Sequence, residues 1–344
     1  MEQKPQEVKK NELIILDTKR SNAINIGMTK LPAPRVIKTA ILRMDSSIIN
    51  REGIEKILSM IPTEEEQTLI TSAQVSNPDL PLGSAENFLL VLSSIPALEA
   101  RLKLWLFRLD YDLLEKEMGE QLMDLKNSME EIEKSSTFKI ILGALLSMGN
   151  FLNGSPAKGF QLEYLEKVTE VKDTVQKHSL LHHLASLVLE HFPESSDLYS
   201  ELGAVTRASR VDYDELVKGL SKMESDCNLC WDYLKVIGKH DTSQPTTAIR
   251  SKMSDFLTDC SERINVLHIV QRRVFNRFKK MLIYLGFPSI TAKEIKPQNV
   301  LKVISEFALE YRTMRERVKE QIEKKRIEKE RIKTRGKMIT EVSN

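Results

Sequence analysis

Along most of the chain, apolar residues recur at spacings of three and four positions, which is the period of one face of an α-helix. The longest such run follows Pro96 and continues to about Lys134, interrupted only by Gly119. Nowhere do β-branched residues alternate with polar ones over several short runs at regular spacing, which disfavours a sheet. The pattern therefore predicts an all-α fold.

The run after Pro96 predicts a long amphipathic helix that needs a partner helix. Its apolar positions are Leu98, Leu102, Leu106, Leu109, Leu122, Leu125, Met129 and Ile132, and the last four have coiled-coil spacing. Matching positions occur at Met253, Leu257, Ile264, Leu267 and Val270. We expect this second segment to run antiparallel to the first.

Several helix ends can be read from local residues. Thr63 and Glu66 form a capping-box pattern, and Ser84 follows a proline and a glycine at the start of another helix. The apolar run from Ile140 should end at Asn153–Gly154, where a left-handed residue can close the helix. Taken alone, Gly149 and Asn150 ahead of that end indicate only close helix packing next to a cap.

The order of these patterns predicts an elongated rod of helical subdomains with a long C-terminal helix. We expect a linker end at 1–12, a compact helical subdomain at 13–95, an ascending coiled-coil arm at 96–135, a second subdomain at 136–215, a descending arm at 216–291, and a long basic helix and tail at 292–344. The apolar face of the last helix, Val303, Phe307, Tyr311, Met314 and Val318, then gives way to alternating Lys, Arg and Glu. Such a tail is either a solvated helix or an anion-binding arm.

Charge is distributed unevenly along the 344 residues, although the net charge is only +2. Residues 1–43 carry +5, residues 312–337 carry +7 and the last seven residues carry −1, which leaves 44–311 at −9. Basic ends on an acidic body suggest an anionic partner, which could be an acidic protein, RNA or a lipid headgroup.

The sequence also disfavours several classes of protein. It has no apolar stretch of the length that a membrane span needs and no signal-peptide core at its start, and its three cysteines suit a reducing compartment, so we expect a cytosolic protein. Cys227 and Cys230 form a CxxC pair without a second pair at zinc spacing, so an incidental helical pair is favoured over a metal or redox site. His178 and His182, four apart on a predicted helix, could share a metal, but a third ligand is not evident and packing is favoured. No cofactor is expected.

The segment from Ile140 to His183 resembles the signature of the formin homology 2 domain, the actin-assembling module of formins. The resemblance rests on Gly149-Asn150-Phe151-Leu152-Asn153-Gly154, Gly159-Phe160, Leu165, Lys172-Asp173-Thr174 and Leu180-Leu181-His182. It extends from about Leu13 to the helix containing Phe307, and Leu16 to Ile26 together with Ser195 to Glu201 is most similar to the FHOD subgroup. The family fold would make 13–95 the knob and 136–215 the post.

The resemblance implies two contacts with actin. It matches Ile26 to the knob isoleucine that contacts the barbed-end groove, with Lys19 and Arg20 beside it as steering charges. From the pattern alone a core position is favoured for Ile26, although burial of Ile24 instead would point Ile26 outward. The resemblance also matches Lys172 and Lys177 to post lysines that contact a second actin subunit, whereas lone surface lysines are ordinarily only solvated.

The resemblance further implies a dimer in which a tryptophan-bearing lasso of one copy encircles the post of the other. The post would receive it at Gly149, Asn150, Phe151, Asn153 and Gly154. Because Trp105 and Trp231 lie elsewhere, we expect the lasso to be missing from this chain. A proline-rich region outside the chain would recruit profilin-bound actin.

We interpret the chain as a non-enzymatic, cytoplasmic formin core of the cytoskeleton. It would bind actin at filament barbed ends and support nucleation and elongation when dimeric. The alternative is a helical scaffold whose basic termini bind RNA or anionic membrane.

Overall fold

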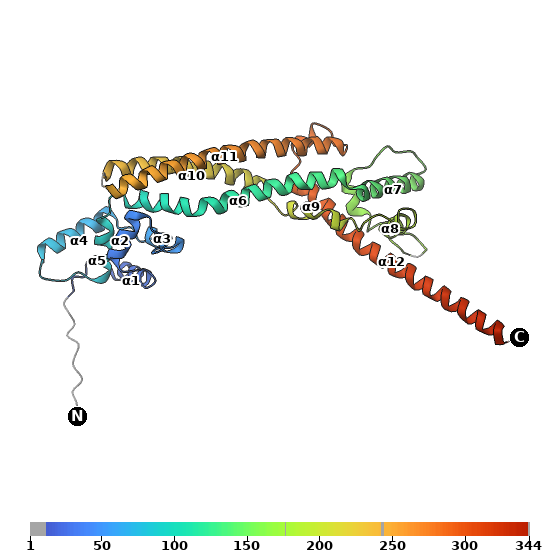
Figure 1. Ribbon diagram of the computed structural model, residues 1–344, viewed down its shortest axis with the longest axis horizontal. Helices are drawn as coiled ribbons and strands as arrows, with labels where there is room; N and C mark the ends of the chain where they lie inside the picture. Colours follow the sequence, from blue (N-terminus) through green and yellow to red (C-terminus); the bar gives the residue numbers. More distant parts are fainter. Residues whose placement is uncertain (1–11, 176, 242–243, 343–344) are drawn as a thin grey trace, which may run out of the picture. The chain divides into compact units, whose positions relative to one another are not determined.

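A computed structural model describes residues 12–175, 177–241 and 244–342, with side chains described as far as Ile332 except at 244–245 (Figure 1). These residues form α-helices, short 3-10 helices and loops, and no strand. Two isolated bridges, Leu13–Leu82 and Lys172–Ser179, are the β-type pairings among them. The all-α prediction is confirmed. The predicted linker end at 1–12 lies almost entirely outside the described residues.

The chain divides into two compact units, each made of two segments. The first unit combines residues up to Lys116 with Leu220–Val266, and the second combines Glu117–Gly219 with Leu267 onward. Three long helices run through both units: α6 (Leu98–Lys134), α10 (Tyr213–His240) and α11 (Gln244–Tyr284).

The first unit contains five shorter helices ahead of α6. They are α1 (Thr18–Met28), α2 (Pro34–Arg43), α3 (Arg51–Leu58), α4 (Glu64–Ser76) and α5 (Ser84–Ser93). The capping box predicted for α4 is present, with Thr63 and Glu66 each accepting a hydrogen bond from the other's backbone N–H. Trp105 of α6 is buried beneath these helices and donates its indole N–H to Ser46 Oγ.

The second unit holds α7 (Ser136–Asn153), α8 (Leu180–His191), α9 (Gly203–Ala208) and α12 (Pro297–Val342), with 3-10 helices at Leu162–Lys167, Tyr199–Glu201 and Thr291–Lys293. Phe307, Tyr311 and Val318 of α12 are buried, Val303 and Met314 are half-buried, and every residue from Lys319 to Ile332 is exposed. The predicted loss of the apolar stripe is thus confirmed, and in Figure 1 α12 continues beyond α8 as a single helix.

The predicted pairing of the long helices was wrong in direction. In the first unit, Phe107 of α6 lies against Phe256 of α11 and the Tyr111 hydroxyl donates to the Cys260 carbonyl. Residue numbers therefore increase in the same direction along the two helices. In the second unit, Gly119 approaches Leu267 and Arg277 pairs with Glu130 at 2.9 Å in the same order. Helix α11 therefore runs parallel to α6 within each unit.

The antiparallel partner of α6 is α10. Lys103 lies over the ring of Tyr233, and Arg101 pairs at 2.7 Å with Asp241, just after α10. The chain then turns and α11 packs antiparallel against α10, with Cys227 Sγ 3.5 Å from Ser261 Oγ. The predicted descending arm at 216–291 is consequently a hairpin of two long helices, and its second member must run parallel to α6.

The buried face of α6 also differs in its first half. Leu122, Leu125, Met129 and Ile132 are buried as the spacing predicted, but Leu106 and Leu109 are only half-buried. Their places in the core are taken by Leu104, Trp105, Phe107 and Tyr111. A helix packed on two sides, here by short helices and by α10 and α11, buries a wider face than a coiled-coil seam.

No single helix among the described residues has the length and apolar character to cross a membrane. Helices α6 and α7, which are bent by 58° at the break between them, have that length and character when taken together.

Candidate functional site

Ile26 is an isolated apolar residue on the outer face of α1. Ile24 is fully buried, whereas Ile26 is 69% exposed. The two lie on opposite faces because residues two apart on a helix are rotated by about 200°. The inner face of α1 packs closely, since a Cβ at Gly27 would collide with Met60 Sδ. The core position that the pattern favoured for Ile26 is therefore wrong, and the core residue is Ile24.

The two basic residues beside this surface differ in their engagement. Lys19 is exposed, and its backbone N–H is capped by Asp17. Arg20 instead donates to both carboxylate oxygens of Glu66 and to the carbonyl of Ile61. Burial raises the pKa of Glu66, but hydrogen bonds from Arg20 and Thr63 outweigh it and the net pKa is lowered. Arg20 thus ties α1 to the start of α4.

Lys172 and Lys177 lie on a loop before α8 that Asp173 organises. Asp173 Oδ1 accepts the backbone N–H of Val175 and Lys177, and Oδ2 accepts that of His178. Lys177 takes a left-handed conformation with φ of 55°. Both lysines are exposed. The loop therefore presents two ammonium groups from a backbone that a single carboxylate holds.

The end of α7 forms an exposed apolar surface next to that loop. Gly154 closes the helix at φ 64°, as predicted, and follows the exposed Asn153. Asn150 holds the next loop by two hydrogen bonds to Ala157, through its side-chain N–H and oxygen. Phe151 is 87% exposed, and an added Cβ at Gly149 would meet nothing within 4 Å. Close packing within the chain, the interpretation of Gly149 from the pattern alone, is wrong.

A mainly apolar hollow of about 420 Å³ lies beside this surface. Its lining residues are Met148, Phe151, Leu152, Val171, Lys172, Asp173, Leu180 and His183. The hollow therefore joins the end of α7, the lysine loop and the first turn of α8, all within the second unit. Of the predicted post residues and lysines, Phe151 and Lys172 line this hollow together.

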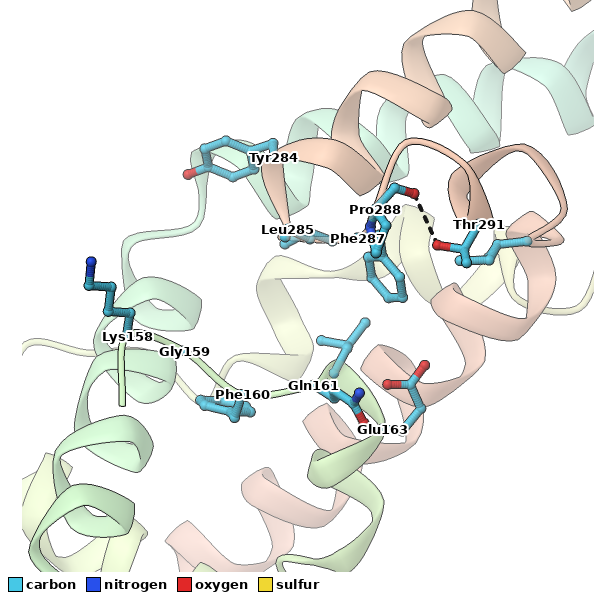
Figure 2. Close-up of a pocket in the computed structure, with 13 residues that line it drawn as sticks. Lys158, Gly159, Phe160, Gln161, Glu163, Tyr284, Leu285, Phe287, Pro288 and Thr291 are labelled. Atoms are coloured by element: carbon cyan, nitrogen blue, oxygen red, sulfur yellow. Dashed lines mark hydrogen bonds between the residues drawn. The ribbon is translucent and has the colours of Figure 1, made fainter. Parts of the chain in front are cut away.

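A second hollow, of about 830 Å³, was not predicted (Figure 2). Lys158 to Glu163 form one side of it and Tyr284 to Thr291 the other. Within the segment Tyr284 to Thr291 the chain turns at Gly286, whose φ is 91°, and the Thr291 hydroxyl donates to the Pro288 carbonyl. A Gly-Phe-Pro sequence signals such a turn, but not the segment that it faces.

The three cysteines do not form a reactive site. Cys227, Cys230 and Cys260 are buried, and burial raises the pKa of each thiol, to about 12 for Cys260. Neutral buried thiols are poor nucleophiles and poor metal ligands. The prediction that His178 and His182 lie on one helix was also wrong, because His178 precedes α8, whose N-cap is Ser179. The two rings stack at 4.0 Å.

Comparison with known sequences gives a consistent family. The sequence model of the Formin Homology 2 Domain matches residues 1–312. FH1/FH2 domain-containing protein 3 of Mus musculus is 56% identical over 333 residues, covering 97% of this chain and 21% of the relative. FH1/FH2 domain-containing protein 1 of Homo sapiens is 52% identical over 327 residues, covering 95% and 28%.

A more distant match is Protein diaphanous of Drosophila melanogaster, 28% identical over 339 residues, covering 92% of this chain and 30% of the relative. The chain spans less than a third of the length of each of these relatives.

Proposed function

Since the chain belongs to the formin homology 2 family and is of the FHOD type, we propose that it binds actin at filament barbed ends. In this proposal, two cooperating copies support nucleation and elongation of unbranched filaments. The family is not enzymatic. Its effect on assembly would come from binding energy, because a protein that binds a rare actin nucleus stabilises it by mass action.

The observation that carries the proposal is the exposed Ile26. An isoleucine that is 69% exposed on a helix with a tightly packed inner face is available to a partner without a rearrangement of the backbone. Interface energy concentrates in such anchors when the partner supplies a dry cleft. The resemblance assigns that cleft to the barbed-end groove of actin.

The lysine loop would make the second contact. Lys172 and Lys177 are exposed on a loop fixed by Asp173, and an acidic surface of another actin subunit would lie against them. Charges at the rim of an interface mainly raise the rate of encounter. Lys19, which is exposed, would act in the same way beside Ile26. Arg20 would contribute less, because Glu66 already pairs with it at 2.8 Å.

We further propose that the end of α7 receives an apolar segment from a second copy. Phe151 and Leu152 are 87% and 65% exposed, and they border the 420 Å³ hollow. The open space over Gly149 would let a partner backbone approach closely. Cytoplasmic location on the actin cytoskeleton is part of the same proposal.

Elongation of sheared actin filament seeds tests barbed-end binding. We expect the chain to change both growth and shortening of seeds with free barbed ends, and to have no effect when those ends are blocked beforehand. An equal effect on blocked seeds would contradict barbed-end binding.

The scaffold alternative makes a different prediction in the same preparation. The basic stretch of α12 after Val318, which is exposed as far as Ile332, would then dominate, and removing it would abolish binding to RNA or anionic vesicles. Barbed-end binding that survives this truncation favours the formin function.

A further inference from the structure

We propose that Asp173, His178 and His183 form a binding site for a divalent transition-metal ion of the zinc type. One ligand atom from each of these residues lies within 4.8 Å of the other two. The spacing of four residues paired His178 with His182 and offered no third ligand. The structure instead groups His178 with a carboxylate and with the next histidine along the chain.

The distances are suited to a small ion after limited movement. Asp173 Oδ2 and His183 Nε2 are 2.9 Å apart. Ligands at about 2.0–2.1 Å from a tetrahedral zinc ion are roughly 3.3 Å from one another. An ion between these two atoms would therefore replace one shared proton and separate them by a few tenths of an ångström. His178, which is half-buried, must approach further, so its ring would have to leave the 4.0 Å stack on His182.

The carboxylate is already oriented for this role. Asp173 Oδ1 is occupied by the backbone N–H groups of Val175 and Lys177, at 2.9 and 3.0 Å. Oδ2 accepts the N–H of His178 at 3.1 Å and lies 2.9 Å from His183 Nε2. Such surrounding hydrogen bonds fix a ligand's direction before the ion arrives.

The ligand set and the access both favour a transition metal. Two imidazoles and one carboxylate suit zinc with a fourth, open position, whereas calcium and magnesium prefer oxygen ligands alone. The side chains of Asp173 and His183 are 29% and 44% exposed, so an ion can reach them from solvent. His182 serves a different contact, because its Nε2 lies 3.1 Å from Gln321 Oε1 of α12.

An ion at this position would connect two features of the second unit. It would tie the loop that carries Lys172 and Lys177 to the first turn of α8. Asp173 and His183 also line the apolar hollow beside Phe151, so one side of that hollow would become fixed. A consequence for actin or for a second copy rests on the proposed function, but metal binding itself does not.

Titration of Zn²⁺ alone into the chain, followed by calorimetry, tests the site without actin. We expect one ion per chain. His183→Gln, His178→Gln and Asp173→Asn should each weaken binding by at least about tenfold, since loss of even a supporting group costs that much. His191→Gln is the matched control, because His191 is exposed on the same helix outside the cluster, and it should bind as the original chain does.

A second measurement covers the possibility that Asp173→Asn loosens the loop. Hydrogen exchange of 172–183 should slow when Zn²⁺ is added to the original chain and should not respond in His183→Gln. Co²⁺ bound at the site should show a spectrum without a thiolate charge-transfer band. Absence of binding, binding undiminished in His183→Gln and His178→Gln, loss of binding in His191→Gln, or a thiolate band would each overturn the proposal. Because no arm uses actin, these failures are distinct from failure of barbed-end binding.

Discussion

Replacing Ile26 by alanine should weaken barbed-end binding without weakening the fold. Full burial of an isoleucine side chain is worth about 1.5–3 kcal/mol. With 69% of Ile26 exposed, docking can still bury about two thirds of that value, roughly 1–2 kcal/mol. A loss of this size raises Kd by about 5- to 30-fold. The melting temperature should hardly change, because surface substitutions usually alter stability by less than about 0.5 kcal/mol.

Two matched variants separate binding from folding. Ile14 is 70% exposed in the same unit but precedes α1, so Ile14→Ala removes the same atoms from a surface without a proposed role. It should retain normal actin affinity. Ile24 is fully buried, so Ile24→Ala should cost about 2–5 kcal/mol in the free energy of unfolding.

Affinity would be measured from the dependence of seed elongation on protein concentration, and stability from denaturant unfolding. Ile26 is not an interface anchor if Ile26→Ala binds barbed ends normally, or if Ile14→Ala loses as much affinity as Ile26→Ala. A large drop in stability for Ile26→Ala would show that its buried third, and not its exposed part, is what matters.

Three further predictions concern the second unit. The double variant Lys172→Glu, Lys177→Glu should slow association with barbed ends and reduce the salt dependence of that rate, because charges are screened over about 8–10 Å at physiological salt. The control Lys293→Glu should leave the association rate unchanged. If the double variant associates as fast as the original chain at low salt, the contact is excluded. Gly154→Ala should lower the free energy of unfolding by about 1–2 kcal/mol, because φ is 64° and only the backbone conformation opposes a Cβ there. Gly149→Ala, which faces open space on α7, should raise the free energy of unfolding by up to about 1 kcal/mol. Changes of the same sign for the two variants in denaturant unfolding would refute this. Burial raises the pKa of Glu201, but hydrogen bonds from Ser135, Ser196 and Thr137 outweigh it and the net pKa is lowered, so its stabilisation should be present above the ordinary value of 4.5 and be lost as pH falls below it. In thermal melts Glu201→Gln should flatten that loss, and an unchanged pH profile would contradict it.

Local features of the fold were predictable because they depend on neighbouring residues. The capping box at Thr63 and Glu66, the left-handed end at Gly154 and the loss of the apolar stripe after Val318 each follow from a few adjacent side chains. The direction of α11 was not predictable in this way. An apolar stripe indicates that a helix has a partner, but it is the same for a parallel and an antiparallel partner.

The direction of α11 depends instead on a turn at the end of α10. Arg101 of α6 is buried there and pairs with Asp241 and Thr246, which places the end of α10 and the start of α11 at the same end of α6. Because an isolated buried charge is costly, Arg101 fixes this arrangement through residues about 140 positions away in the sequence. A period of three and four cannot show that pairing.

The residues of the α7 signature divide into two groups once their contacts are known. Asn150 and Gly154 have roles inside the chain, since one holds the following loop and the other closes the helix. Gly149 and Phe151 have no comparable role, because one faces open space and the other is 87% exposed. A glycine inside a helix costs about 1 kcal/mol relative to alanine, and an exposed phenylalanine gains little from folding. The fold alone therefore does not account for these two residues, whereas a partner that packs closely over the end of α7 would account for both.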